Sequence, residues 1–282
     1  MVLRKFLDFF VRLSGFLFIV NFTIILYFSY ILKGKLWRWE YRIFRKSYFY
    51  SGGFSNKVLE KLLSIKTGDY RTDEAKEIDR NGYIIVKDFL SYDEIEEISL
   101  IIDEKSNIPR GSTRLDVPEG DLKNSETLDR LFFNDEFIKG IAKDYLGDKC
   151  RIDLRAAWRS FAKASVNKSE LSKAAQMWHV DLDTVKWLKA FIYLTDVDAN
   201  GGPHCYCPGT HKSLPLGIIR DGRYSNEMIK SLNIHSEILL APRGTLILAD
   251  TRGIHKGEPV LKGERKIIQL QYSASSFGQL SS

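Results

Sequence analysis

The sequence has few cysteines and no long run of basic residues. Its three cysteines, Cys150, Cys205 and Cys207, are an odd number, and two of them are separated by one residue. This argues against a disulfide framework and favours reduced thiols, as in the cytosol. Nowhere do five or more Lys or Arg residues follow one another, so the net charge of +6 gives little support to nucleic-acid binding. A mildly basic chain is equally compatible with a membrane surface or with anionic substrates.

Internal repeats and low-complexity tracts are also absent. The 282 residues suffice for one large domain or two small ones, and 44% apolar with 28% charged residues is ordinary globular composition. We divide the chain into three parts: an N-terminal hydrophobic segment (1–35), a basic and aromatic connector (36–68) and a large C-terminal domain (69–282).

Charge is missing altogether from residues 13–32, "LSGFLFIVNFTIILYFSYIL". About 20 apolar residues match the thickness of a bilayer, so we expect a membrane-embedded helix here. No A-x-A site follows, which argues against a cleaved signal peptide. Basic residues are denser after the segment than before it, which would leave the large C-terminal part in the cytoplasm. A helix packed on the domain of a cytoplasmic protein, or a hairpin in one leaflet, remains the alternative.

The C-terminal domain (69–282) is expected to be mainly β with flanking helices. Residues 74–104 are predicted to form a helix, a short strand and a second helix; Gly82 ends the first, and Ser91 with Glu94 forms a capping box for the second. Further strands are predicted within 150–164, 187–197, 244–250 and 265–274, which suggests a two-sheet jelly roll. The segments 105–128 and 213–236 are expected to be variable loops that cover the mouth of the site.

Only five histidines occur, and two of them fit a metal site. In "WHVDLD" (178–183), His179 and Asp181 are two residues apart, so on a strand both side chains point to the same side. His255 follows the apolar strand at 244–250. Two imidazoles and one carboxylate form the facial triad of non-haem Fe(II) oxygenases, although an isolated H-x-D motif occurs by chance in many chains.

Arg265, ten residues after His255, begins the next predicted strand. Its guanidinium is suited to binding the far carboxylate of a keto acid held by the metal. On the strand at 151–161, Arg155 and Arg159 share one face. They are either outward polar residues or cavity residues that hold an anionic group of the substrate.

Other polar residues near these motifs could be mistaken for ligands. "HCYCPGTH" (204–211) resembles a zinc cluster, yet strand alternation puts Cys205 and Cys207 on one face and His204 on the other. Asp183 is in phase with His179, and we expect it to make an outer contact or a turn. Arg252 and Lys256, on either side of His255, are as readily solvated as functional.

The sequence resembles the phytanoyl-CoA dioxygenase family of Fe(II)- and 2-oxoglutarate-dependent oxygenases over roughly residues 75–275. The resemblance depends on "NGYIIVKDFLSYDEI", "AAQMWHVDLD", "FIYLTDVDANGGPHCYCPGTHK" and "GTLILADTRGIHKGEPVLKGERKIIQLQYSAS". It implies a double-stranded β-helix, with iron bound by His179, Asp181 and His255, and 2-oxoglutarate bound by Arg265. Some members contact the cosubstrate through a tryptophan at the position of Phe191 here, and Lys189 or Tyr193 on the same strand face is expected to replace it.

The activity implied is hydroxylation of a small-molecule or lipid-like substrate, with O₂ and 2-oxoglutarate consumed and succinate and CO₂ released. Asp181 is present, whereas halogenases on this scaffold carry a small residue there, so hydroxylation is favoured over halogenation. A non-oxidative cupin-like metalloenzyme and a non-catalytic binding module are the alternatives. The substrate itself is not indicated by the sequence.

Overall fold

The computed structural model describes residues 60–110, 113–122, 125–162, 175–181, 184–215, 218 and 222–275. The hydrophobic segment 13–32, most of the connector and Asp183 lie outside these residues. Within the part of the chain that is described, no helix has the length and apolar character needed to cross a membrane.

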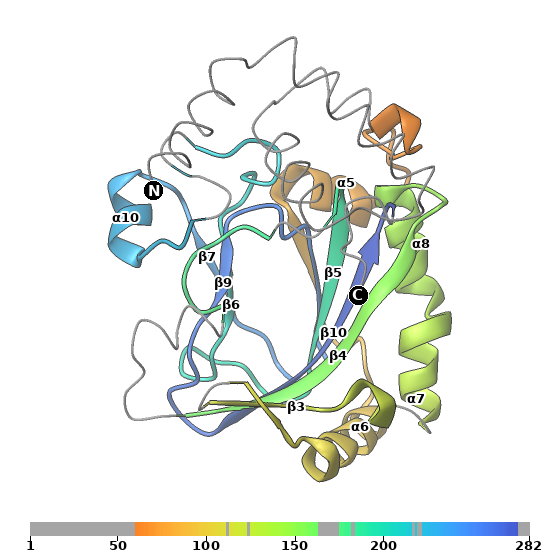
Figure 1. Ribbon diagram of the computed structural model, residues 1–282, viewed down its shortest axis with the longest axis vertical. Helices are drawn as coiled ribbons and strands as arrows, with labels where there is room; N and C mark the ends of the chain where they lie inside the picture. The colour runs from red at the N-terminus through yellow and green to blue at the C-terminus, as the bar shows by residue number, and fades with distance from the viewer. Residues whose placement is uncertain are drawn as a thin grey trace, which may run out of the picture.

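Antiparallel strands dominate this part of the chain (Figure 1). A seven-stranded sheet has the order β1-β8-β5-β10-β4-β3-β2, and a three-stranded sheet has the order β7-β6-β9. The strands are β1 (Tyr83–Val86), β2 (Ile108–Pro109), β3 (Arg114–Asp116), β4 (Arg151–Phe161), β5 (Trp187–Tyr193), β6 (His204–Tyr206), β7 (Glu237–Leu239), β8 (Leu246–Ala249), β9 (His255–Gly257) and β10 (Glu264–Ser273). The four strand segments predicted after residue 150 are confirmed as β4, β5, β8 and β10.

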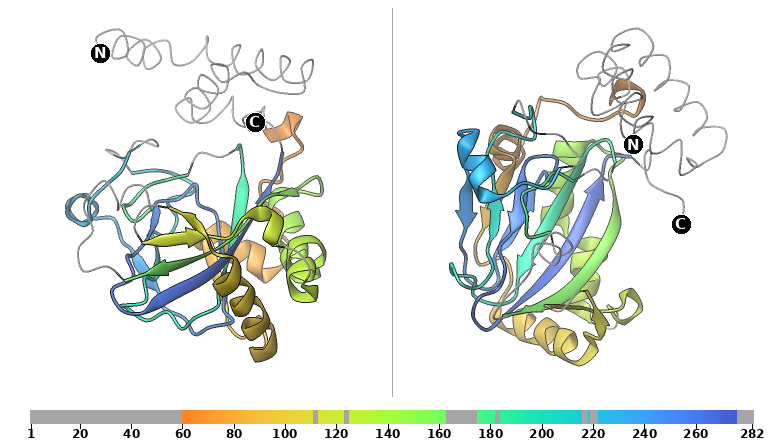
Figure 2. Two further views of the ribbon diagram at one scale, coloured as in Figure 1. Left: turned by 60° about the horizontal axis from the view of Figure 1, so that its bottom comes forward. Right: turned by 60° about the vertical axis from the view of Figure 1, so that its left-hand side comes forward.

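Helices flank the large sheet on the side away from the small one (Figures 1 and 2). They are α5 (Asp73–Asn81), α6 (Tyr92–Lys105), the 3₁₀ turn η1 (Glu119–Asp121), α7 (Glu126–Asp129), the π-helical turn η2 (Arg130–Asn134) and α8 (Glu136–Leu146), while α10 (Asn226–Ser231) lies beside the small sheet. The predicted loop at 105–128 is wrong in part, because β2 and β3 pair with each other and β3 pairs with β4.

Local sequence signals explain the first helix–strand–helix unit. Thr72 accepts a hydrogen bond from the Ala75 amide at the start of α5, and Gly82 ends the helix in the left-handed region at φ 94°. A side chain at Gly82 would also collide with the Tyr206 ring. The capping box between Ser91 and Glu94 is present at the start of α6, as predicted.

Strand alternation creates two apolar layers and, between the sheets, a cavity. On β5, Leu188, Ala190 and Ile192 pack against the helices. Phe191 and Tyr193, which point the other way, pack between the two sheets with residues such as Tyr206, Ile247 and Ile267. Because side chains alternate along each strand, this inner face of the large sheet also carries the polar groups that surround the cavity.

Candidate functional site

Two backbone hydrogen bonds join the chain segments that carry the histidines. The His179 amide donates to the His255 carbonyl at 3.0 Å, and the His255 amide donates to the His179 carbonyl at 2.9 Å. The Asp181 amide donates to the Thr251 carbonyl at 2.9 Å. This short antiparallel ladder fixes the register that places Asp181 beside both imidazoles.

The three side chains predicted as ligands meet in one cluster. One potential ligand atom from each of His179, Asp181 and His255 lies within 4.8 Å of the other two. Each histidine Nε2 is 3.5 Å from an Asp181 oxygen. His179 Nδ1 lies 2.8 Å from the Met177 carbonyl, and His255 Nδ1 lies 2.9 Å from the Gly253 carbonyl. With the Nδ1 protons donated to these carbonyls, each Nε2 lone pair is available to a metal.

Lys189 lies against the carboxylate of this cluster. Its ammonium donates to Asp181 Oδ2 at 2.6 Å, and only 8% of the residue is exposed. Although burial opposes ionisation, Lys189 and the neighbouring His255 hold the pKa of Asp181 well below its usual range. Burial and the nearby His255 lower the pKa of His179. The resulting set, an ionised carboxylate and imidazoles with free lone pairs, is what a divalent cation requires.

Arg265 lies at the other end of the same cavity. It is 7% exposed, and one terminal nitrogen donates to the Gly202 carbonyl. Its Nε has no hydrogen-bond partner, and no carboxylate among the described residues forms an ion pair with it. Burial lowers the pKa of Arg265. A buried guanidinium without a counter-ion is costly, so this end of the cavity favours an anion.

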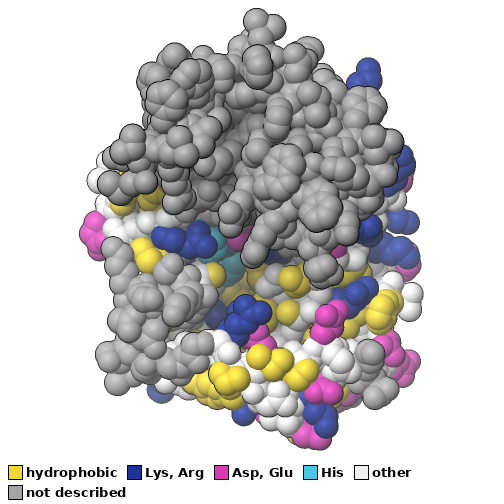
Figure 3. Space-filling model, viewed as in Figure 1, with side chains coloured by type: hydrophobic (Ala, Val, Ile, Leu, Met, Phe, Trp, Pro, Cys, Tyr) yellow, Lys and Arg dark blue, Asp and Glu magenta, His cyan; other side chains and the backbone are white. Residues whose placement is uncertain are grey.

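The cavity between these ends has a volume of about 130 Å³, well below that of pockets for drug-sized ligands. Fourteen residues line it: Arg114, Trp158, Ala175, His179, Asp181, Lys189, Phe191, Tyr193, His204, His255, Gly257, Arg265, Ile267 and Gln269. In Figure 3 histidine side chains are visible in a hollow bordered by basic side chains. Lys189, Phe191 and Tyr193, predicted to share one strand face, all point into it.

Among the lining residues that the sequence analysis did not predict, three have side chains with notable contacts. His204 on β6 stacks on His255 with the ring centroids 5.7 Å apart, and its Nε2 has no partner. The Nε1 of Trp158 on β4 is also buried without a partner, and the Arg114 guanidinium lies 3.8 Å from the Trp158 ring centroid. Strand alternation around Cys205 and Cys207 was the available signal for His204.

Arg155 and Arg159 share a strand face, but it is the face opposite the cavity. On β4, Trp158 lies in the cavity wall, so the odd-numbered neighbours point toward the helices. Arg155 Nε donates to the Phe132 carbonyl, and Arg159 lies 3.4 Å from Asp103 of α6. Of the two interpretations left open by the sequence, the structure favours outward polar residues, which contact the helical side of the sheet, over cavity residues that hold the substrate.

The other polar residues that could be mistaken for metal ligands make structural contacts instead. Cys205 and Cys207 are buried together in an apolar cluster that includes Trp178 and Ile254, away from His204. Arg252 forms an ion pair with the buried Asp250 at 2.6 Å. Lys256, also buried, donates to Asn226 Oδ1 at 2.9 Å. Among the described residues, the one group with metal-binding geometry is the cluster of His179, Asp181 and His255.

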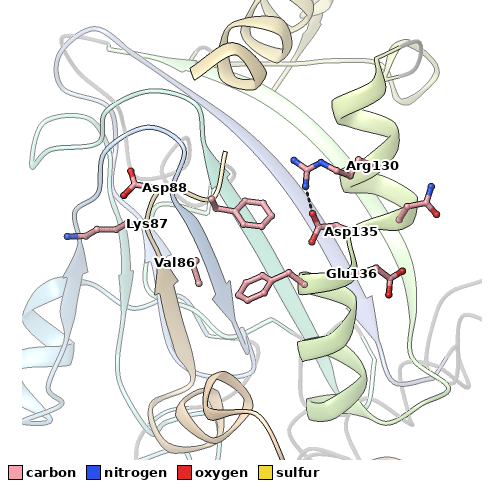
Figure 4. Close-up of a pocket in the computed structure, with 9 residues that line it drawn as sticks. Val86, Lys87, Asp88, Arg130, Asp135 and Glu136 are labelled. Atoms are coloured by element: carbon pink, nitrogen blue, oxygen red, sulfur yellow. Dashed lines mark hydrogen bonds and ion pairs between the residues drawn. The ribbon is translucent and has the colours of Figure 1, made fainter. Parts of the chain in front are cut away.

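A separate hollow lies between the end of β1 and the start of α8 (Figure 4). Val86, Lys87, Asp88 and Glu136 line it, and Arg130 forms an ion pair with Asp135 beside it. The ion pair satisfies both charges, and the metal-type cluster found among the described residues lies elsewhere. We therefore place the candidate site between the sheets.

Comparisons with known proteins identify the family of the chain. The family model for phytanoyl-CoA dioxygenase (PhyH) matches residues 78–266, more than half of the chain. No protein in the curated set matches the chain significantly.

Solved structures share the fold at low sequence identity. HygX from Streptomyces hygroscopicus, solved with nickel, 2-oxoglutarate and hygromycin B, has a TM-score of 0.56 at 14% identity over 72% of this chain and 87% of its own. The α-ketoglutarate-dependent epimerase SnoN from nogalamycin biosynthesis has a TM-score of 0.53 at 19% identity over 71% and 81%. EctD from S. alaskensis with bound Fe has a TM-score of 0.52 at 19% identity over 77% and 84%.

Proposed function

Since the chain belongs to the phytanoyl-CoA dioxygenase (PhyH) family, we propose that it is an Fe(II)- and 2-oxoglutarate-dependent dioxygenase that hydroxylates a small molecule. The cofactors are Fe(II), 2-oxoglutarate and O₂, in keeping with the family and with the three-ligand cluster. The observation that supports this best is the pairing, in one cavity, of a facial triad with a buried guanidinium that lacks a counter-ion. Residues 69–282 are proposed to form the catalytic domain.

His179, Asp181 and His255 are the proposed iron ligands. Three protein ligands on one face leave the other positions of an octahedral ion open, as the reaction requires. The Met177 and Gly253 carbonyls hold the imidazole rings in orientation. Lys189 binds one Asp181 oxygen, which favours coordination of the metal through the other.

Arg265 is the proposed partner of the far carboxylate of 2-oxoglutarate. A guanidinium offers paired N–H donors to a carboxylate, and desolvation in the cavity strengthens the interaction. Tyr193 lies in the same wall and its hydroxyl accepts a hydrogen bond from the His204 amide at 2.9 Å, which leaves its own proton for a ligand. Phe191 provides an apolar surface between the two ends of the cosubstrate.

When bound, iron and 2-oxoglutarate together activate O₂, so that one oxygen atom enters a substrate C–H bond and the other leaves in succinate alongside CO₂. The residues of the chain position the reactants and exclude water from the cavity. The ligand cluster fixes where the reaction occurs, Arg265 fixes the direction of the cosubstrate, and the two apolar layers limit water. The wall formed by Trp158 and Arg114 is left for the substrate.

The test measures succinate release from the purified full chain. The protein is reconstituted with Fe(II) without oxygen and then supplied with 2-oxoglutarate, O₂ and panels of lipids, amino acids and sugars. We expect succinate to depend on both iron and 2-oxoglutarate, and one class of compounds to stimulate it.

The matched control replaces a ligand without touching the rest of the cavity. His255→Ala is expected to lose iron-dependent turnover, whereas His235→Ala, at an exposed histidine, is expected to retain it. Iron binding without any consumption of O₂ or 2-oxoglutarate across the panels would favour the non-oxidative metalloenzyme instead.

A further inference from the structure

His204 is a buried polar side chain whose outer nitrogen has no partner. The residue is 8% exposed, and Nε2 makes no hydrogen bond within the described part of the chain. Burying a polar nitrogen without a partner costs free energy, so such a group in a cavity wall indicates a missing ligand. Packing alone would be served better by leucine or methionine at this strand position.

The ring of His204 lies next to the triad, and its backbone pairs with a glycine that borders Arg265. On β6 the residue is directly opposite Gly257 of β9. A side chain at Gly257 would lie 3.8 Å from one terminal nitrogen of Arg265 and 3.9 Å from the other, so the guanidinium is beside the same glycine. The ring also stacks on His255 and lies 4.8 Å, centroid to centroid, from Phe191.

Metal ligation does not explain His204. The cluster of mutually close ligand atoms contains His179, Asp181 and His255, without His204. The two neighbouring cysteines point to the other face of β6 and pack in a different apolar cluster, so a zinc site with them is excluded as well. Another polar group in this wall that lacks a partner on one of its nitrogens is Arg265, through its Nε.

An acceptor placed at that end would satisfy both groups. Arg265 Nε and His204 Nε2 are both without partners in the same cavity wall. A carboxylate has about four acceptor positions, enough for a guanidinium and an imidazole together. Imidazole can donate through Nε2 while neutral, in the Nε2–H tautomer, so no change of protonation is needed.

We propose that His204 donates a hydrogen bond from Nε2 to the carboxylate that Arg265 binds, so that this chain grips the far end of a 2-oxo dicarboxylic acid with two side chains. The inference rests on the proposed function, because it assigns a further residue to the same cosubstrate. It makes His204 a determinant of selectivity between dicarboxylic and monocarboxylic 2-oxo acids.

The test compares two ligands on metal-loaded protein, without turnover. Calorimetry on the full chain loaded with Ni(II) measures binding of 2-oxoglutarate and, by displacement, of 2-oxopentanoate, in which a methyl group replaces the far carboxylate. His204→Leu is expected to weaken 2-oxoglutarate binding about tenfold or more and to change 2-oxopentanoate binding less than about threefold. His204→Gln, whose amide nitrogen reaches the place of Nε2, is expected to stay within about threefold of the wild type for both.

Other variants keep the test decisive. If His204→Leu does not fold, His204→Asn takes its place, because its amide nitrogen reaches only the position of Nδ1, and it should lose affinity as the leucine variant would. Equal 2-oxoglutarate affinity in the wild type and in the leucine or asparagine variant overturns the proposal. Equal losses for both ligands overturn it too, since they indicate packing.

Different outcomes of this experiment overturn the role of His204 and the proposed oxygenase function. If the wild type binds Ni(II) but not 2-oxoglutarate, the oxygenase assignment fails. If it binds both, and the His204 variants match it, only the role of His204 fails. His235→Gln, at an exposed histidine, serves as the control for effects of histidine replacement in general.

Discussion

His179 and His255 are bound to each other through their own backbones, each amide donating to the carbonyl of the other. Two imidazoles distant in sequence are thereby held in one register before any side chain contributes. The two ring centroids lie 4.3 Å apart. Asp181 completes the set from the same strand segment, two residues after His179.

Replacing Asp181 with alanine should remove most of the metal affinity. The two histidines stay in register, but two neutral ligands lack the charge that a divalent ion prefers. We expect a loss of at least about 100-fold in Fe(II) affinity, beyond the 10- to 100-fold typical of residues that only support ligands, and severely impaired succinate release. Anaerobic metal titration measures the first. Asp196→Ala, at an exposed carboxylate paired with Arg243, is the control, and full succinate release by Asp181→Ala would overturn the ligand assignment.

Lys189→Met should destabilise the metal-free protein. The change leaves the Asp181 carboxylate without its ammonium partner in a mostly buried site, at a cost of about 3 kcal/mol. A divalent ion supplies the missing positive charge, so added Ni(II) should raise the melting temperature more in the variant than in the wild type. Thermal unfolding with and without Ni(II) measures both. Equal stability of the two metal-free proteins would contradict the pairing.

Arg265→Lys tests whether the fork of the guanidinium matters or only its charge. Lysine keeps one positive charge but cannot offer two parallel donors to a carboxylate. We expect 2-oxoglutarate to bind at least about tenfold more weakly while Ni(II) affinity is unchanged. Arg243→Lys, at an exposed ion pair, should change neither quantity. Unaltered 2-oxoglutarate affinity in Arg265→Lys would show that the cosubstrate binds elsewhere.

Acid should loosen the attachment of residues 66–72 to α8. The buried Asp144 carboxylate accepts hydrogen bonds from the Arg71 and Thr72 amides at 2.8 Å and pairs with Lys66 at 2.5 Å. These contacts hold the pKa of Asp144 well below its usual range, despite burial. A depressed carboxylate pKa stabilises the fold above the unfolded value of about 3.9, and this stabilisation is lost as the pH falls below it.

Asp144→Asn isolates that contribution. The variant should be less stable than the wild type at pH 7, and the difference should shrink as the pH falls from about 5 toward 3. Urea unfolding at several pH values measures it. Asp73→Asn, at an exposed acid paired with Lys76, should show little difference at any pH. A difference that stays constant with pH would contradict the role of the ionised carboxylate.

The triad could be predicted because strand alternation relates His179 to Asp181 directly. His255 was proposed from its place after an apolar strand, and the family resemblance supported it, since nothing local in the sequence pairs its segment with residue 179. Alternation also predicted correctly that Arg155 and Arg159 share a face. Alternation could not predict whether that face points to the cavity or to the helices, because this depends on tertiary contacts. Here Arg159 lies beside Asp103 on α6, and Arg155 donates to the Phe132 carbonyl.

His204 shows a different limit of sequence reasoning. Alternation separated it from the cysteines, but a single histidine in a turn-rich motif has no partner along the chain to indicate a role. Its meaning depends on Arg265 and Gly257, which reach it from β10 and β9. The same holds for Trp158 and Arg114, whose contact joins β4 and β3 and is invisible before these strands pair.

The carbonyls that hold the two imidazoles come from residues two positions earlier in the same segments, Met177 and Gly253. Each ring is therefore oriented by a backbone carbonyl of its own segment, independently of a bound ion. The two side chains are preorganised, so they would lose little conformational entropy when a metal binds. The protein should accordingly tolerate cycles of emptying and refilling with its sheets undisturbed.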